Sequence, residues 1–132
     1  MNRRAQGTFE VKLTPQKSDN ADATGANLGR MSINKQFHGD LEAVSHGEML
    51  SAITEVKGSA GYVAMERVSG ALEGRQGAFV LQHSGTMNRG VPEMTVTVVP
   101  DSATGDLKGL SGRMTIAIDA GKHSYVFEYT QP

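Results

Sequence analysis

The sequence predicts an all-β protein folded as a single closed antiparallel barrel of about eight strands. A chain of 132 residues is the length of one domain with one core. Its 16 glycines exceed the average share of about 7% and are spread along the whole chain, as expected of turns between strands. Between the turns, apolar and polar residues alternate with a period of two, which is the pattern of a strand with one buried face. We therefore treat residues 1–132 as one β-barrel domain.

The turn signals divide the chain into seven or eight segments of strand length. Glycine, proline, asparagine and aspartate mark turns because they adopt the backbone conformations that turns need. The segment 14–27 is polar and rich in Asp, Asn, Gly and Thr, so we expect an exposed loop there, which could equally be a lid. Strands at this spacing are typical of an antiparallel sandwich or barrel. The other candidate turns lie at 39–40, 57–58, 73–74, 88–90, 101–105 and 120–121.

Alternation assigns one face of each segment to the interior, and it is clearest near the end of the chain. Met114, Ile116 and Ile118 alternate with polar residues, and the apolar face of the last segment carries Tyr125 and Phe127. The same pattern recurs on the earlier segments, at Phe9, Val11 and Leu13, at Met31, Ile33 and Phe37, at Phe79 and Leu81, and at Met94, Val96 and Val98.

One segment, 40–56, also fits a helix. Its apolar residues Leu41, Val44 and Ile53, mixed with Met49 and Leu50, can be aligned at spacings of three and four. A glycine in its middle and the lack of any other helix-length segment favour a strand instead. We expect a long strand interrupted by a bulge at 45–47, because glycine commonly marks such a kink.

Five short stretches carry a resemblance to a known family. They are KQFHGDL at 35–41, GSAGYVA at 58–64, LQHSGTM at 81–87, VVPDS at 98–102 and HSYVFEY at 123–129. The chain resembles, over nearly its whole length, a family of small uncharacterised bacterial proteins classed as a domain of unknown function. That resemblance implies an eight-stranded antiparallel barrel like that of the allene oxide cyclases. It implies no activity, because fold analogy alone does not give function.

Composition and missing motifs exclude several functions. The net charge is -1, with the basic residues dispersed, so we expect no nucleic-acid partner. No apolar run is long enough for a membrane span or a secretory signal, and we expect a cytoplasmic protein. Without cysteine there is no thiolate chemistry, and no phosphate-binding loop or nucleophile elbow occurs. The sequence therefore does not decide whether the protein is an enzyme.

The histidines do not form a convincing metal site, and we expect neither a metal nor a cofactor. His46 and Glu48 are two residues apart, but Gly47 between them can break the strand register, so we interpret both as solvated. His83 and Ser84 are neighbours on a strand and point to opposite faces, which argues against a nucleophilic pair.

Four polar residues share a face with the apolar set, on four different segments: Lys35, Glu66, His83 and Tyr125. Burying an unpaired charge is costly, so these groups must pair with one another or line a wet cavity. We predict that they line a polar ligand-binding cavity. The simpler interpretation places each at the barrel rim, and reversal of its strand would turn Arg67 inward in place of Glu66. The methionines and the aromatic residues are expected to fill the core.

These observations favour a small-molecule-binding barrel for a small hydrophobic or amphipathic ligand, with or without isomerase-like or cyclase-like chemistry. The alternative is a non-catalytic structural or protein-interaction barrel, for which residues 91–94 would supply an exposed edge. We also expect a homo-oligomer, because strands with one apolar face can bury part of the outer surface against a second copy.

Overall fold

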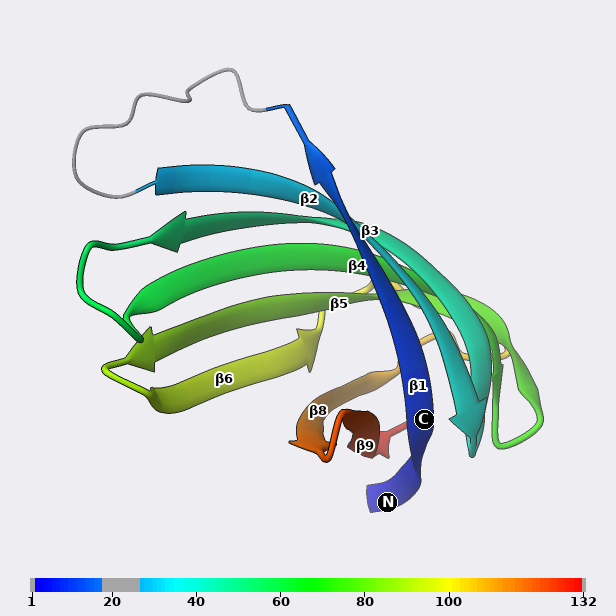
Figure 1. Ribbon diagram of the computed structural model, residues 1–132. Coiled ribbons are helices and arrows are strands. Elements are labelled where there is room, and N and C mark those ends of the chain that lie inside the picture. Colours follow the sequence, from blue (N-terminus) through cyan, green and yellow to red (C-terminus); the bar gives the residue numbers. More distant parts are fainter. Residues whose placement is uncertain (1, 18–26, 132) are drawn as a thin grey trace.

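Nine strands and no helix make up the computed structural model, which describes residues 2–17 and 27–131 (Figure 1). The described part therefore contains no helix that could cross a membrane. The strands are β1 (Asn2–Gln16), β2 (Asn27–Gly39), β3 (Leu41–Ile53), β4 (Ala60–Leu72), β5 (Arg75–Asn88), β6 (Val91–Val98), β7 (Thr104–Gly105), β8 (Ser111–Asp119) and β9 (Lys122–Thr130).

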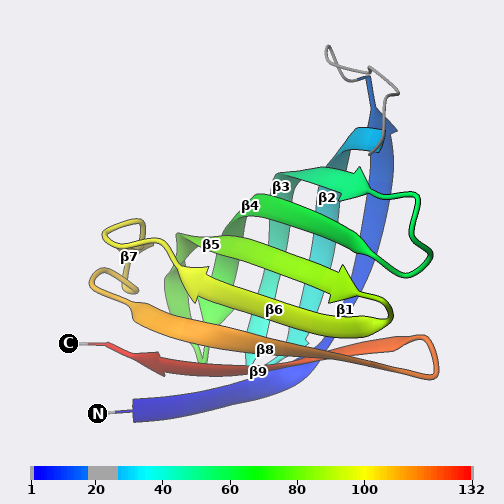
Figure 2. The same ribbon diagram turned by 90° about the vertical axis from the view of Figure 1, so that its left-hand side faces the viewer.

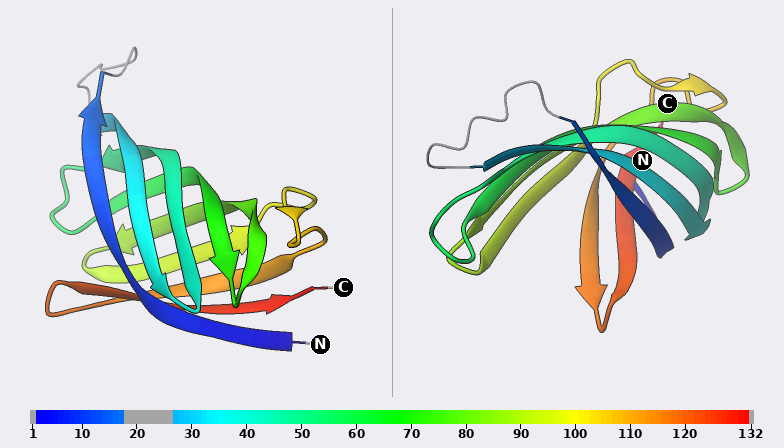
Figure 3. Two further views of the ribbon diagram at one scale, coloured as in Figure 1. Left: turned by 90° about the vertical axis from the view of Figure 1, so that its right-hand side faces the viewer. Right: turned by 45° about the horizontal axis from the view of Figure 1, so that its top comes forward.

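Eight of the strands close into an antiparallel barrel, which confirms the predicted fold class. The order around the barrel is β4, β3, β2, β1, β9, β8, β6 and β5, and the pairing of β4 with β5 closes the ring. The short β7 pairs with β5 at the edge. Two opposed views show the wall curving around one interior (Figures 2 and 3). Closure matters because it removes most of the unpaired edges that an open sheet leaves exposed. The exception is the contact of β6 with β8, which pair at Thr97 and Arg113 alone.

Most of the segment 40–56 is a strand, β3 at 41–53, but the predicted bulge at 45–47 is wrong. The register of β3 continues without an inserted residue against both β2 and β4. Gly47 has a different role, because a Cβ atom on it would lie 2.2 Å from the carbonyl oxygen of Met65. The glycine thus permits a close approach of β3 to β4. Because no residue is inserted, alternation along β3 leaves Ser45 on the inner face.

Most predicted turns are correct, and three of them are two-residue hairpins with a glycine second. Glu73-Gly74, Arg89-Gly90 and Ala120-Gly121 have positive φ at both positions, which matches the twist of antiparallel strands. The boundary predicted at 14 is wrong, because β1 continues to Gln16 in pairing with Arg30. The rest of that predicted loop, 18–26, lies outside the described residues.

The two ends of the barrel differ. At the end where both termini lie (Figure 2), the interior is filled by aromatic and leucine side chains, and Leu107 and Leu110 close it. At the opposite end lie the turns β3–β4, β5–β6 and β8–β9. There, inner-face residues are exposed, including Leu13 (47%) and Ile118 (65%). Over residues 2–17 and 27–131, the barrel is therefore a cup with a packed base and an open mouth.

Candidate functional site

Four neighbouring strands place polar side chains at one level of the interior. Lys35 on β2 pairs with Ser45 on β3, Gly47 of β3 pairs with Glu66 on β4, and Ala64 of β4 pairs with His83 on β5. All four polar residues are buried, and the residues before and after each of them in its strand are exposed or partly exposed. We call Lys35, Ser45, Glu66 and His83 the polar cluster.

Glu66 is the centre of the polar cluster. Its Oε2 lies 3.0 Å from Lys35 Nζ and accepts a hydrogen bond from the Ser45 hydroxyl at 2.9 Å. Its Oε1 lies 3.2 Å from His83 Nε2 and 3.4 Å from Lys35 Nζ. Both carboxylate oxygens are thus bonded, as a buried charge requires.

Two opposing effects set the charge of Glu66. Burial alone would raise the pKa of Glu66, but the hydrogen bond from His83 and the charge of Lys35 outweigh it and lower the pKa below its ordinary value. Lys35 is also held over the ring of Phe9, with Nζ 4.7 Å from the ring centroid. The carboxylate is therefore ionised at neutral pH and faces an ammonium group held on the opposite side by an aromatic ring.

An apolar hollow of about 220 Å³ lies between the polar cluster and the mouth of the barrel. We call it the mouth pocket. Residues alternate between the two faces of each strand, so Tyr62 shares the inner face with Glu66, and Gly85 shares it with His83. Counting in this way along each strand shows that the inner wall of the mouth pocket lies on β3 to β6. The ring of Tyr62 lies across Gly85, where a Cβ atom would be 2.4 Å from it. The inner-wall residues are Met49, Ser51, Ala60, Tyr62, Gly85, Met87, Pro92 and Met94.

Tyr62 connects this pocket to the polar cluster. Its ring centroid lies 6.3 Å from that of His83. Burial and the nearby negative charge of Glu66 raise the pKa of Tyr62 above its ordinary value. The hydroxyl therefore stays protonated at neutral pH and can donate a hydrogen bond.

The structure brings together three of the four residues predicted to line a site, namely Lys35, Glu66 and His83. Tyr125 lies elsewhere, nearer the packed base. Its hydroxyl accepts a hydrogen bond from the Leu41 amide at 2.9 Å and donates one to the His38 carbonyl at 2.9 Å. The same inner-face rule selected it, but that rule carries no information about height along the barrel axis.

Two residues of the site were missed. Ser45 fell in the wrongly predicted bulge, which hid its alternation with Ala43 and Gly47 on the inner face. Tyr62 was expected in the core with the other aromatic residues, although alternation with Ala64 and Glu66 could have placed it on the polar face. The methionines at the mouth were likewise expected in the core, whereas Met87 (39%) and Met94 (44%) are exposed.

The remaining sequence candidates point outward. Arg67 is exposed, so the strand carrying Glu66 has the orientation first assigned to it. The ring of His46 hydrogen bonds to Asn34 at 2.6 Å, and Glu48 pairs with Arg30 at 2.6 Å. Within residues 2–17 and 27–131, no three histidine or carboxylate side chains are grouped as a metal site would require.

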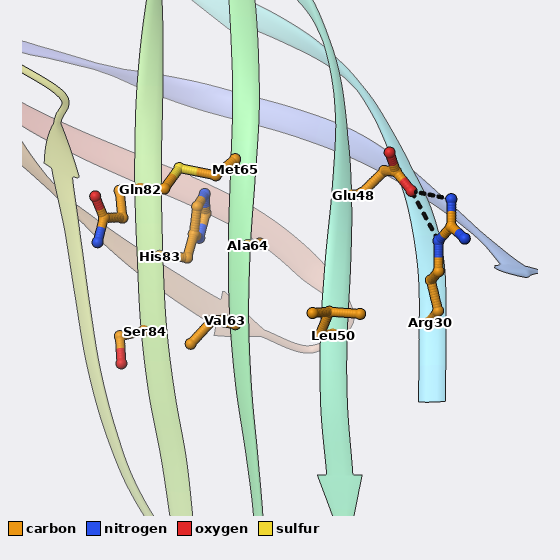
Figure 4. A pocket seen from close by; sticks show the side chains of 9 residues that line it. All are labelled: Arg30, Glu48, Leu50, Val63, Ala64, Met65, Gln82, His83 and Ser84. Atoms are coloured by element: carbon orange, nitrogen blue, oxygen red, sulfur yellow. Dashed lines mark hydrogen bonds and ion pairs between the residues drawn. The ribbon is translucent and has the colours of Figure 1, made fainter. Parts of the chain in front are cut away.

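A second hollow, of about 550 Å³, lies on the outer surface of the same wall (Figure 4). Leu50, Val63 and Met65 supply its apolar part, and the ion pair of Arg30 with Glu48 lies at one side. Because His83 and Ala64 belong to the inner face, the sheet separates this outer hollow from the polar cluster.

Fold and site together define a class of small antiparallel β-barrels that hold an ion-paired polar cluster below an open mouth. Residues 5–129 match the family model described as "Protein of unknown function (DUF3224)", and the chain belongs to that family. The chain is similar to a crystal structure of a DUF3224 protein of unknown function from Shewanella oneidensis MR-1. The two share 51% identity with a TM-score of 0.95, over 100% of this chain and 99% of that one. No curated protein matches. The predicted resemblance to a family of unknown function with a barrel fold is confirmed.

Proposed function

We propose that this protein binds a small apolar molecule in the mouth pocket, with the polar cluster as the floor of the site. The observation that carries the proposal is an apolar, open-ended hollow on the same inner faces as the buried, charged cluster, with the ring of Tyr62 in its lining 6.3 Å from that of His83. Pockets of this kind, with apolar walls and few polar groups, are the usual sites for small ligands. A volume of about 220 Å³ is small for such a site and suits a small ligand, or one end of a longer one.

The composition of the walls supports this proposal. Inner-face positions elsewhere in the barrel are packed, yet Met87, Met94 and Ile118 keep exposed apolar surface at the mouth. Burying such surface against a ligand is favourable by roughly 25 cal/mol per Å². Methionine side chains are flexible and polarizable, so they adapt to ligands of different shape.

The polar cluster also offers chemistry beyond binding. A histidine whose Nε2 is held by a carboxylate is oriented in the manner of a general base. Isomerase-like or cyclase-like turnover, and the likeness to allene oxide cyclase barrels, remain predictions that depend on a ligand reaching His83. Proton transfer requires that reach before it requires a suitable pKa.

The experiment is a titration with the fluorescent, uncharged probe N-phenyl-1-naphthylamine. Met49→Glu places a charge in the mouth pocket, and Met65→Glu is its matched control on the outer face of the neighbouring strand. We expect saturable binding to the wild type, loss of binding in Met49→Glu and unchanged binding in Met65→Glu. Equal loss in both variants, or no binding by the wild type, would reject the mouth pocket as a ligand site.

A second candidate, a protein-interaction barrel, is favoured by the outer hollow. Leu50, Val63 and Met65 are each more than half exposed (57%, 51% and 52%) and lie side by side on β3 and β4. Arg30 and Glu48 beside them carry opposite charges, so two copies related by a two-fold axis could exchange this ion pair. Light scattering tests the predicted homo-oligomer, and Val63→Glu should convert it to a monomer.

A further inference from the structure

The polar cluster is complete without a ligand. In the described residues, every fully buried side-chain nitrogen and oxygen atom has a hydrogen-bond partner. Glu66 already accepts from Lys35, Ser45 and His83, and Lys35 lies against aromatic rings on its other side. The floor of the site therefore offers no free positive charge to an anionic ligand.

Polar groups on the inner wall of the mouth pocket are few. Thr86 and Glu93 also line it, but alternation assigns them to the outer faces of β5 and β6. Ser51 and Tyr62 are the polar residues on inner-face positions of this lining, and they are direct cross-strand neighbours. A hydrogen bond from an inner-face hydroxyl of this lining to a bound molecule must therefore come from Ser51 or Tyr62.

Tyr62 is the better placed of the two. Its ring reaches toward the polar cluster, 6.3 Å from the imidazole of His83, whereas Ser51 lies on β3, which β4 separates from β5. The hydroxyls of Tyr125 and Tyr129 are used within the protein, on the Leu41 and His38 backbone and on Glu73 respectively. The Tyr62 hydroxyl is the one that borders the pocket.

The charge of a ligand group decides whether that group can lie next to the Tyr62 hydroxyl. Burial and the negative charge of Glu66 both raise the pKa of Tyr62, so its hydroxyl stays protonated and acts as a hydrogen-bond donor. A ligand carboxylate at the same place would lose its water in an apolar pocket, where no free positive charge is offered to it. An ammonium group would lose its water there, and Glu66 is already neutralised by Lys35.

We infer that the mouth pocket selects an uncharged apolar molecule carrying one hydrogen-bond acceptor, such as a ketone or ether oxygen, which Tyr62 recognises by donating its hydroxyl proton. This inference rests on the proposed function, since it specifies the ligand class of the same pocket. Tyr62 is thereby the specificity-determining residue, and charged ligands are excluded because the apolar pocket and the internally paired cluster offer them no free countercharge.

The test is displacement of bound N-phenyl-1-naphthylamine by four compounds of one chain length: decan-2-one, decane, decanoate and decylamine. At pH 7.5 we expect decan-2-one to displace the probe most effectively, about threefold to tenfold better than decane, as one neutral hydrogen bond allows. Decanoate and decylamine should be weaker than decan-2-one by at least about tenfold, because each carries a charge into an apolar pocket.

Tyr62→Phe provides the matched variant, since it keeps the ring over Gly85 and removes only the hydroxyl. It should abolish the preference for decan-2-one over decane, measured as the ratio of their two displacement constants within the variant, so that a change in the affinity for the probe itself cancels. Decanoate or decylamine competing as well as decan-2-one, or a preference that survives in Tyr62→Phe, would overturn the inference while leaving the pocket intact. Failure of the probe to bind the wild type would instead overturn the proposed function.

Discussion

Gly47 and Glu66 lie directly opposite each other in the pairing of β3 with β4, and the glycine makes room for the strand that carries the carboxylate. A Cβ atom at position 47 would lie 2.8 Å from the Cα of Glu66 and closer still to the Met65 carbonyl oxygen. Both contacts are to backbone, which cannot move aside as a flexible side chain would. The strands can therefore approach closely enough at this level for Glu66 to meet Ser45 and Lys35.

Gly47→Ala should destabilise the protein by about 1–3 kcal/mol, the usual cost of forcing extra volume into a packed site. Gly61→Ala is the matched control, because a Cβ atom there would meet its nearest neighbour at an ordinary 3.8 Å. Urea unfolding measures both. The explanation fails if the two alanine variants have the same free energy of unfolding.

Removing Lys35 should cost more than removing the whole ion pair. Lys35→Met leaves the buried carboxylate of Glu66 without its countercharge, and breaking a buried pair in this way costs about 3–5 kcal/mol. Lys35→Met combined with Glu66→Gln removes the uncompensated charge, so the double variant should unfold at higher urea than Lys35→Met. Additive losses in the double variant would show that the two residues do not interact.

The contribution of Glu66 should depend on pH in one direction. Its pKa in the folded protein is below the ordinary 4.5, so folding favours the ionised form. The stabilisation is fully present above pH 4.5 and is lost as the pH falls through the lower folded-state pKa. We expect the difference in unfolding free energy between wild type and Glu66→Gln to shrink in this acid range. A difference independent of pH down to complete protonation would contradict the assigned charge.

The sequence predicts which residues of this site face the barrel interior better than it predicts which of them lie at the same level. Period-two alternation placed Lys35 and His83 on the inner face with their apolar neighbours. For Glu66 it left two orientations open, because apolar residues lie on both faces of that strand, and the exposure of Arg67 in the structure decides between them. Alternation says nothing about which inner-face residues share a level. Level is set by register between strands distant in sequence, and for this reason Tyr125 was grouped with residues that it does not contact.

The open mouth was also beyond the sequence. Met87, Met94 and Ile118 fit the pattern of core residues, and their exposure follows from what covers the barrel ends. The packed base is covered by Leu107 and Leu110 from the segment after β6, while at the mouth the β5–β6 and β8–β9 connections are two-residue hairpins. Hydrophobic patterning identifies the inner face but not whether another segment covers it.

Tyr125→Phe should separate fold stability from ligand binding. The variant leaves the buried Leu41 amide without its acceptor, and an unsatisfied buried donor costs about 1–3 kcal/mol. Probe binding at the mouth should not change, because Tyr125 lies outside the polar cluster. Tyr62→Phe should show the opposite pattern, with stability retained and ligand selectivity lost. If the folded Tyr125→Phe variant binds the probe more weakly than the wild type, Tyr125 belongs to the ligand site after all.

The weakest joint of the barrel, meaning the shortest pairing between neighbouring strands, lies between β6 and β8. These strands pair at a single position, Thr97 with Arg113, and then diverge toward the mouth, as Figure 1 and the right panel of Figure 3 show. A hollow of about 360 Å³ lies between them. Each strand is fully paired on its other side, so the facing backbone groups form two short edges. Further pairing would satisfy those edges and narrow the way into the pocket.

A disulfide can test whether this joint closes. Continued antiparallel pairing would bring Thr95 opposite Thr115, both on the outer surface, and the protein has no cysteine to interfere. A disulfide needs Cα atoms about 4.4–6.8 Å apart, so it can form between these positions only when the two strands come together. We expect Thr95→Cys combined with Thr115→Cys to cross-link under mild oxidation. The cross-linked protein should melt at a higher temperature and take up N-phenyl-1-naphthylamine more slowly, and a reductant should reverse both changes. If the thiols stay reduced, the joint is fixed open; if they cross-link without slowing uptake, the ligand enters through the mouth alone.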